Sequence, residues 1–144
     1  DDGNDALVSA LELEIDNPSD AIAEYKDIIS NFSDGSVAPV AVERLFGLIK
    51  SHYDGVARTI QLRRLARYYD GICDTTDSNS LFWKAHRSRL WTLAALREYD
   101  DAITGFERIV QNPDCLSDSI FAVIDIGSLH LEASEWAMRD SINR

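Results

Sequence analysis

The sequence has little of what builds β-structure or crosses a membrane. Only three prolines and seven glycines occur in its 144 residues, and no alternating segment rich in valine or threonine is present. This disfavours a β-sandwich or a barrel, which need many short strands and turns. No apolar run reaches the roughly 18 residues that cross a bilayer, and the first residues (Asp1, Asp2 and Asp5) are acidic where a signal peptide is basic and then apolar. We therefore expect no membrane insertion and no targeting segment in this stretch.

Basic residues are also scarce. Fourteen lysines and arginines face 25 acidic residues, so the net charge is −11 and the isoelectric point is near 4.5. Because binding to phosphates needs a basic surface, we expect no nucleic-acid partner. The charge is segregated: residues 1–40 carry −9, residues 41–97 carry +5 and residues 98–144 carry −7. Either the basic centre is neutralised by its acidic neighbours, or it forms a surface that docks anions.

What the sequence does contain is a helical pattern of apolar residues. Between Asn17-Pro18 and the turn at Asp34-Gly35-Ser36, for example, Ala21, Tyr25 and Ile28 recur at spacings of three and four. Similar stripes, separated by breaks such as Asp54-Gly55 and the polar segment 74–79, predict seven helices. Their expected ranges are about 6–15, 19–29, 39–49, 55–72, 80–96, 98–110 and 118–136.

The second, fourth and sixth of these helices begin near residues 19, 55 and 98, at spacings of 36 and 43, which is typical of stacked helix pairs. One pair cannot hide its own apolar stripe, so the core must form between neighbouring pairs. We predict an all-α fold, a right-handed α-α superhelix of about seven helices in antiparallel pairs. Residues 1–144 would form a single domain, with a concave surface lined by the first, third, fifth and seventh helices.

Two segments align with each other and resemble the tetratricopeptide repeat. These are Ala21-Ile22-x-x-Tyr25-x-x-Ile28-Ile29 and Tyr99-x-x-Ala102-Ile103-x-x-Phe106-x-x-Ile109-Val110, with Pro113 near the family's closing proline. The sequence departs from the family where Ser33 replaces that proline, where the tryptophan-leucine-glycine signature is missing, and over residues 37–72, which fit only as helices. The resemblance implies the packing of the family but not its peptide-binding residues.

A closer resemblance covers most of the chain. The segments 21–31, 97–103 and 112–127 look like the helical repeat region of secreted multidomain proteins of Gram-negative bacteria that use the type IX route. In such proteins the region commonly precedes a C-terminal sorting domain. The resemblance implies an extracellular or cell-surface accessory module without catalytic residues of its own. Because the chain lacks an initiator methionine, we also expect it to be a fragment of a longer protein.

The last helix and the two cysteines carry further expectations. Ile120, Ile124 and Leu131 share one side of that helix, which is apolar enough to predict a partner, and Trp136 is a candidate interface residue.

Cys73 and Cys115 follow the fourth and sixth helices at equivalent corners of neighbouring repeats. They could form a disulfide if the loops adjust, which secretion would favour, or remain two unpaired thiols.

The central arginines are the candidate docking site. Arg63 and Arg67 lie four residues apart on one helix face, and Arg87 follows on the next helix, so forked hydrogen bonds to carboxylates could form there. The alternative is that they are solvated arginines of the outer face that pair with the acidic repeats.

The sequence predicts no metal site, no cofactor and no catalytic centre. His52, His86 and His130 lack a second ligand three or four residues away. We expect His86 and His130 to pack between helices and His52 to lie at a helix end. The loop 74–79 lacks the glycine and distal glutamate of a calcium loop, so we interpret it as a helix cap.

No nucleophile elbow or phosphate loop occurs either, so we do not expect an enzyme. The predicted function is a non-enzymatic interaction or spacer module of a secreted or cell-surface protein. Its partner would be another protein or adjoining domains of the same chain. The alternative is a cytoplasmic adaptor that binds an acidic peptide through the central arginines.

Overall fold

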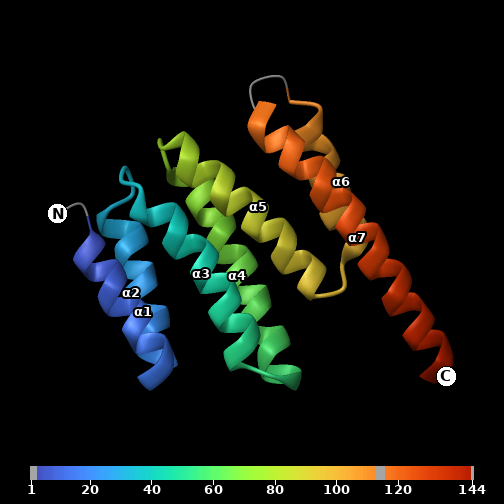
Figure 1. Cartoon of the computed structure of the whole chain (residues 1–144), viewed down its shortest axis with the longest axis horizontal. Coiled ribbons are helices and arrows are strands. Elements are labelled where there is room, and N and C mark those ends of the chain that lie inside the picture. The colour runs from blue at the N-terminus through green and yellow to red at the C-terminus, as the bar shows by residue number, and fades with distance from the viewer. Residues whose placement is uncertain (1–2, 113–115, 144) are drawn as a thin grey trace. The chain divides into compact units, whose positions relative to one another are not determined.

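The chain is helical throughout the part that the structure describes. A computed structural model describes residues 3–112 and 116–143, with the side chains of residues 116–119 left out, and it contains no strand in these ranges. Figure 1 shows the helices, which are α1 (Asn4–Asp16), α2 (Pro18–Asn31), α3 (Val37–His52), α4 (Gly55–Thr75), α5 (Asn79–Ala95), α6 (Tyr99–Val110) and α7 (Leu116–Asn143). All seven predicted helices are confirmed. The fourth and the last are longer than expected. Helix α4 continues past Ile72 to Thr75, so the expected loop 74–79 is shortened to residues 76–78, and the last helix continues past Trp136 to Asn143.

Local sequence signals explain where the helices begin. The Asn17 side chain accepts a hydrogen bond from the backbone N–H of Asp20 (3.2 Å), and Pro18 occupies the first helical position of α2, where no N–H is needed. At the start of α5, the Ser78 hydroxyl accepts from the backbone N–H of Leu81 (3.3 Å). This contact confirms that the polar segment after α4 caps the following helix.

The chain divides into two compact units, residues 1–92 and residues 93–144, with the boundary inside α5. In the first unit each helix packs on the next, α1 on α2, α2 on α3 and α3 on α4, and α1 also contacts α3. Neighbour-on-neighbour packing of this kind is consistent with a helical repeat. That residues 1–144 form a single domain stays a prediction.

The core of the first unit is centred on α3, which buries a broad apolar face. Its buried residues are Val37, Ala38, Ala41, Val42, Leu45, Leu48 and Ile49. Tyr69 of α4 is fully buried and donates its hydroxyl to the Val42 carbonyl at 2.6 Å. This bond satisfies the one polar atom that the ring brings into the core, and it fixes α4 against α3.

Two ion pairs connect the first part of α5 to the helices before it. Lys84 Nζ lies 3.3 Å from Glu43 Oε2 of α3, and Arg89 Nε lies 2.6 Å from Asp70 Oδ1 of α4. The carboxylates of both pairs are more than half exposed, at 69% and 53%. Pairs of this exposure add little stability and mainly fix orientation.

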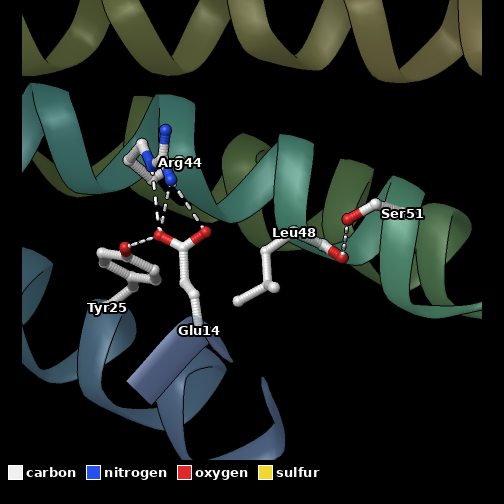
Figure 2. Close-up of polar contacts among 5 residues, drawn as sticks. All are labelled: Glu14, Tyr25, Arg44, Leu48 and Ser51. Carbon is white, nitrogen blue, oxygen red and sulfur yellow. Dashed lines mark hydrogen bonds and ion pairs between the residues drawn. The ribbon is translucent and has the colours of Figure 1, made fainter. Parts of the chain in front are cut away.

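One carboxylate connects three helices (Figure 2). Glu14 of α1 accepts a hydrogen bond from the Tyr25 hydroxyl of α2, and it accepts hydrogen bonds from Arg44 of α3 at 2.9 Å (Nη2) and 3.1 Å (Nε). Tyr25 is fully buried. Burial and the hydrogen bond to Glu14 together raise the pKa of Tyr25 to about 12. The carboxylate is only 16% exposed, so this contact is shielded from water better than the pairs of α5.

The second unit consists of the last turn of α5 together with α6 and α7, and α6 packs along α7. Arg97 ends α5 in the left-handed region, with φ of +66°. The N–H groups of Arg97 and Glu98 bond back to the carbonyls of Ala94 and Leu93, both at 2.9 Å, which is the Schellman pattern. The Arg97 guanidinium then lies 4.5 Å from the centre of the Trp136 ring and donates to the Tyr99 hydroxyl.

We predict that Glu14→Ala lowers the free energy of unfolding by about 2 kcal/mol, because it removes a charged acceptor from the buried Tyr25 hydroxyl. Urea denaturation followed by circular dichroism would measure the change. Glu12→Ala is the matched control, since Glu12 is exposed on the same helix and should change stability by less than about 0.5 kcal/mol. We call Glu14, Tyr25 and Arg44 the Glu14 cluster. Equal effects of the two substitutions would show that the contacts of this cluster add no stability to the fold.

Candidate binding site

A cavity of about 620 Å³ lies between the C-terminal halves of α2 and α4. Its buried apolar residues are Ile29 of α2, Ile72 of α4 and Leu81 of α5, which are at most 8% exposed. Its polar residues come from the same helices and from the two adjacent loops, and they are Ser30, Ser33, Asp34, Arg67, Tyr68, Thr75, Thr76 and Asp77. The volume is in the range of small-molecule and side-chain pockets in proteins.

Charged side chains of both signs border this cavity. Arg67 contributes an exposed guanidinium from α4, whereas Asp34 and Asp77 contribute exposed carboxylates from the loops. Lys26 of α2 lies with its Nζ 5.1 Å from the centre of the Tyr68 ring, so a second cation lies against a lining residue. Burial raises the pKa of Tyr68 to about 12, and the nearby Asp27 carboxylate contributes to the shift. The Tyr68 hydroxyl therefore keeps its proton at neutral pH and can donate a hydrogen bond.

This arrangement can hold an apolar side chain next to a carboxylate. Ile29, Ile72 and Leu81 offer an apolar surface, and Arg67 can donate two parallel hydrogen bonds to a carboxylate. An acidic residue beside an apolar one, within a peptide, has this chemistry.

A second hollow, of about 510 Å³, lies on α1 and α3 and is lined by Glu14, Glu43, Arg44, Gly47, Leu48 and Ser51. Figure 2 shows four of these lining residues, Glu14, Arg44, Leu48 and Ser51. The charges of this hollow are largely used within the fold, because Arg44 pairs with Glu14 and Glu43 pairs with Lys84. The cavity between α2 and α4 is therefore the stronger candidate.

The three predicted docking arginines lie on two helices. Arg63 and Arg67 are both exposed on α4, and Arg87 is half-buried on α5. Among the described residues that line the cavity, Arg67 is the only one of the three. The fold thus places Arg67 at a cavity that the sequence pattern did not predict.

Several other basic residues of the central segment pair with carboxylates. Arg44 pairs with Glu14 from the acidic N-terminal segment, whereas Lys84 and Arg89 pair with Glu43 and Asp70 from the central segment itself. Part of the positive charge of residues 41–97 is therefore neutralised by ion pairs within the fold. This neutralisation leaves the contribution of Arg67 to the cavity unchanged.

Cys73 lies within the last turn of α4 and not after it, as was expected. It is half-buried, and its thiol donates to the Phe82 carbonyl of α5 at 3.7 Å. Burial, together with the carboxylates of Asp70 and Asp74, raises the pKa of the thiol to about 11. Cys115, the other half of the predicted disulfide, lies outside the described residues, so the disulfide stays a prediction.

The histidines differ from expectation in one case. His52 ends α3, as predicted, and His86 is half-buried against Phe82, with ring centres 5.9 Å apart. Burial, with a contribution from Arg89, lowers the pKa of His86. The prediction that His130 packs between helices is wrong, because its side chain is exposed on α7, away from the face that packs on α6.

The structure also places the residues that were predicted to meet a partner. Trp136 is 39% exposed and is partly covered by Arg97, whereas Ile120, Ile124 and Leu131 of α7 are 58%, 60% and 64% exposed. The most exposed apolar surface of α7 therefore lies along these aliphatic residues and not at the tryptophan.

Sequence reasoning missed the two places where the fold brings distant residues together. The Glu14 cluster joins residues 30 positions apart, and the cavity joins Ile29 to Leu81. The helical stripes predict that Ile29 and Ile72 are buried, but they do not say which turns of α2 and α4 leave a space between them.

Comparison with known proteins finds no matching protein family, no matching curated protein and no matching solved structure. No three histidine, cysteine, aspartate or glutamate side chains among the described residues are grouped as a metal site requires. Within the same part of the chain, no helix has the length and apolar character to span a bilayer.

We predict that Cys73 alkylates slowly in the native protein, because little thiolate exists at pH 8 when the pKa is about 11. In a Cys115→Ser variant, the rate with iodoacetamide should be at least about tenfold below that of the same protein unfolded in urea, where the thiol pKa is near 8.5. Equal rates in the two states would mean that Cys73 is neither buried nor perturbed.

Proposed function

We propose that this chain is a non-enzymatic module that binds another polypeptide, or that holds adjoining domains apart, in a larger secreted or cell-surface protein. The observation that carries the binding role is the cavity between α2 and α4, which combines apolar residues with an arginine at its border. Such a site suits recognition of a side chain within a peptide. Most of its lining residues lie on packed helices, so it can bind without large rearrangement.

We also propose that the helices form a right-handed superhelix. The contact of α1 with α3, in addition to the contact of each with α2, supports a helical repeat. If further pairs stack in the same sense, side chains from alternate helices would share one surface. The resemblance to tetratricopeptide repeats supports the right-handed sense.

Secretion is proposed on the resemblance to helical regions of proteins that use the type IX route. It implies a longer native chain and an oxidising environment, in which Cys73 and Cys115 could pair. We predict that the protein in its native source has a mass well above 16.1 kDa and carries a C-terminal β-rich domain. Intact-mass and terminal-sequence measurements, with and without reduction, would test this. A native chain of 144 residues with two free thiols would contradict it.

An adaptor that binds an acidic peptide through Arg63, Arg67 and Arg87 is the second candidate function. The position of Arg67 at the cavity favours it, because a carboxylate held there would lie beside an apolar surface. This candidate needs no secretion and would act in the cytoplasm. The two candidates share a peptide-binding mechanism and differ in where the chain acts and what it is attached to.

We predict that the chain binds peptides in which Asp or Glu precedes Leu, Ile or Phe, and that binding weakens at about 0.5 M salt, where exposed charges are screened. Fluorescence anisotropy would compare a pool of such 12-residue peptides with a pool in which Asn and Gln replace the acids. Binding should be restricted to the acidic pool. The double variant Arg63→Glu plus Arg67→Glu should abolish it.

The matched control is Arg108→Glu plus Arg139→Glu, which makes the same charge change at exposed positions of α6 and α7. This control should bind like the unchanged chain. Binding that is independent of salt, or that the control loses equally, would reject the role of the arginine-bordered cavity. Absence of binding to both pools would leave only the spacer role.

A further inference from the structure

The last helix has a second apolar face on the side opposite α6. Its exposed residues are Ile120, Ile124, Leu131, Met138 and Ile142, at 58%, 60%, 64%, 66% and 76% exposure. With 3.6 residues per turn these five lie within about 40° of one another, and they extend for about 33 Å along the helix. Ala122 and Leu129, which are fully buried, lie on the other side. We call the five exposed residues the α7 stripe.

A helix that is apolar on two opposite sides has the pattern of an internal helix. In this chain α3 also contacts two helices, α2 and α4, but it does so through one broad apolar arc, whereas the two apolar sides of α7 are opposite each other. By the same physical argument, the α7 stripe is suited to contact another helix, because exposed aliphatic surface of this length is costly to leave in water.

The charges beside the stripe restrict which helix fits. Residues 120–143 carry four acidic side chains and one arginine, and the exposed Glu135 lies next to the stripe, with the exposed Glu132 further round the same flank of the helix. An apolar helix face with basic neighbours is complementary to this surface, whereas one with acidic neighbours is repelled. A symmetric contact between two α7 helices would bring the acidic borders together and is disfavoured.

The first half of α4 has the complementary character. Val56 and Ile60 are 78% and 46% exposed, and Arg63 and Arg67 continue the same side of the helix, with Arg64 beside them. No acidic residue occurs between Gly55 and Arg67. We call residues 56–67 the α4 face.

Among the described residues a further exposed apolar face lies on α1, with Val8, Leu11 and Ile15 at 54%, 37% and 87% exposure. It lies among four acidic residues and no basic one, over 4–16. Like charges therefore make it a poor partner for the α7 stripe.

We propose that the α7 stripe of one copy of this chain docks on the α4 face of a second copy. The inference goes beyond the proposed function and does not depend on peptide binding. The two surfaces differ, so in a pair of copies one keeps an unused α4 face and the other keeps an unused α7 stripe. Further copies can add to these surfaces unless the copies close into a ring.

Sedimentation velocity of the purified chain tests this proposal. The average mass should rise above the monomer between micromolar and near-millimolar concentration, and the rise should be smaller at about 0.5 M salt. Leu131→Glu and Ile60→Glu should each abolish self-association. An equimolar mixture of these two variants should recover a heterodimer, because one variant keeps an intact α4 face and the other an intact α7 stripe.

Ile15→Glu is the matched control, since it places the same acid on the exposed apolar face of α1, and it should leave the association intact. Circular dichroism melting verifies that each variant is folded. If a glutamate variant unfolds, Ile124→Ser and Val56→Ser make the same comparison with smaller changes.

Three results would overturn the proposal. The unchanged chain could be monomeric at every concentration, which would mean that the stripe is covered otherwise or stays in water. Ile60→Glu could associate like the unchanged chain, which would indicate pairing of two α7 helices or use of another surface. The mixture of the two variants could stay monomeric, which would exclude a contact between two different faces.

Discussion

Burial of α3 between α2 and α4 is the constraint on which the first unit depends. An isolated helix of 16 residues has little stability in water, and most of its stability in a protein comes from packing of its apolar side chains. The apolar side chains of α3 are shared between two neighbours, so removing either helix would expose part of its surface. Within this unit α2, α3 and α4 each pack on the helix that precedes them in the chain, so each added helix buries apolar surface that the previous one exposes.

The polar contacts add specificity to this apolar packing. Aliphatic side chains tolerate small sliding of one helix along another, whereas the Glu14 carboxylate satisfies a tyrosine and an arginine from two other helices in one arrangement only. The hydrogen bond from Tyr69 to the Val42 carbonyl restricts α4 in the same way. Both contacts are within or near the core, where competition from water is weak.

The sequence predicted the helices well because their signals are local. Spacings of three and four, Pro18 at the start of α2 and the hydroxyl cap at Ser78 act within a few residues. The candidate site was predicted only in part. Arg67 could be identified as one of a group of arginines, but its place beside Ile29 and Leu81 depends on how three helices cross, which no local pattern encodes. The exposure of His130 was missed for a similar reason, since α7 is apolar on two sides and the pattern does not say which side packs on α6.

The left-handed conformation of Arg97 has a consequence for which residues this turn can accept. A residue with a Cβ costs about 1 kcal/mol in this region of the backbone map, a cost that glycine avoids. A cation stacked on an indole returns a similar amount, about 0.5–1 kcal/mol at a partly exposed site. Glycine would relax the backbone and uncover the Trp136 ring, while alanine would keep the strain and also lose the stacking. Position 97 therefore accepts either glycine, which avoids the backbone strain, or a long cationic side chain that offsets the strain by stacking, whereas alanine does neither.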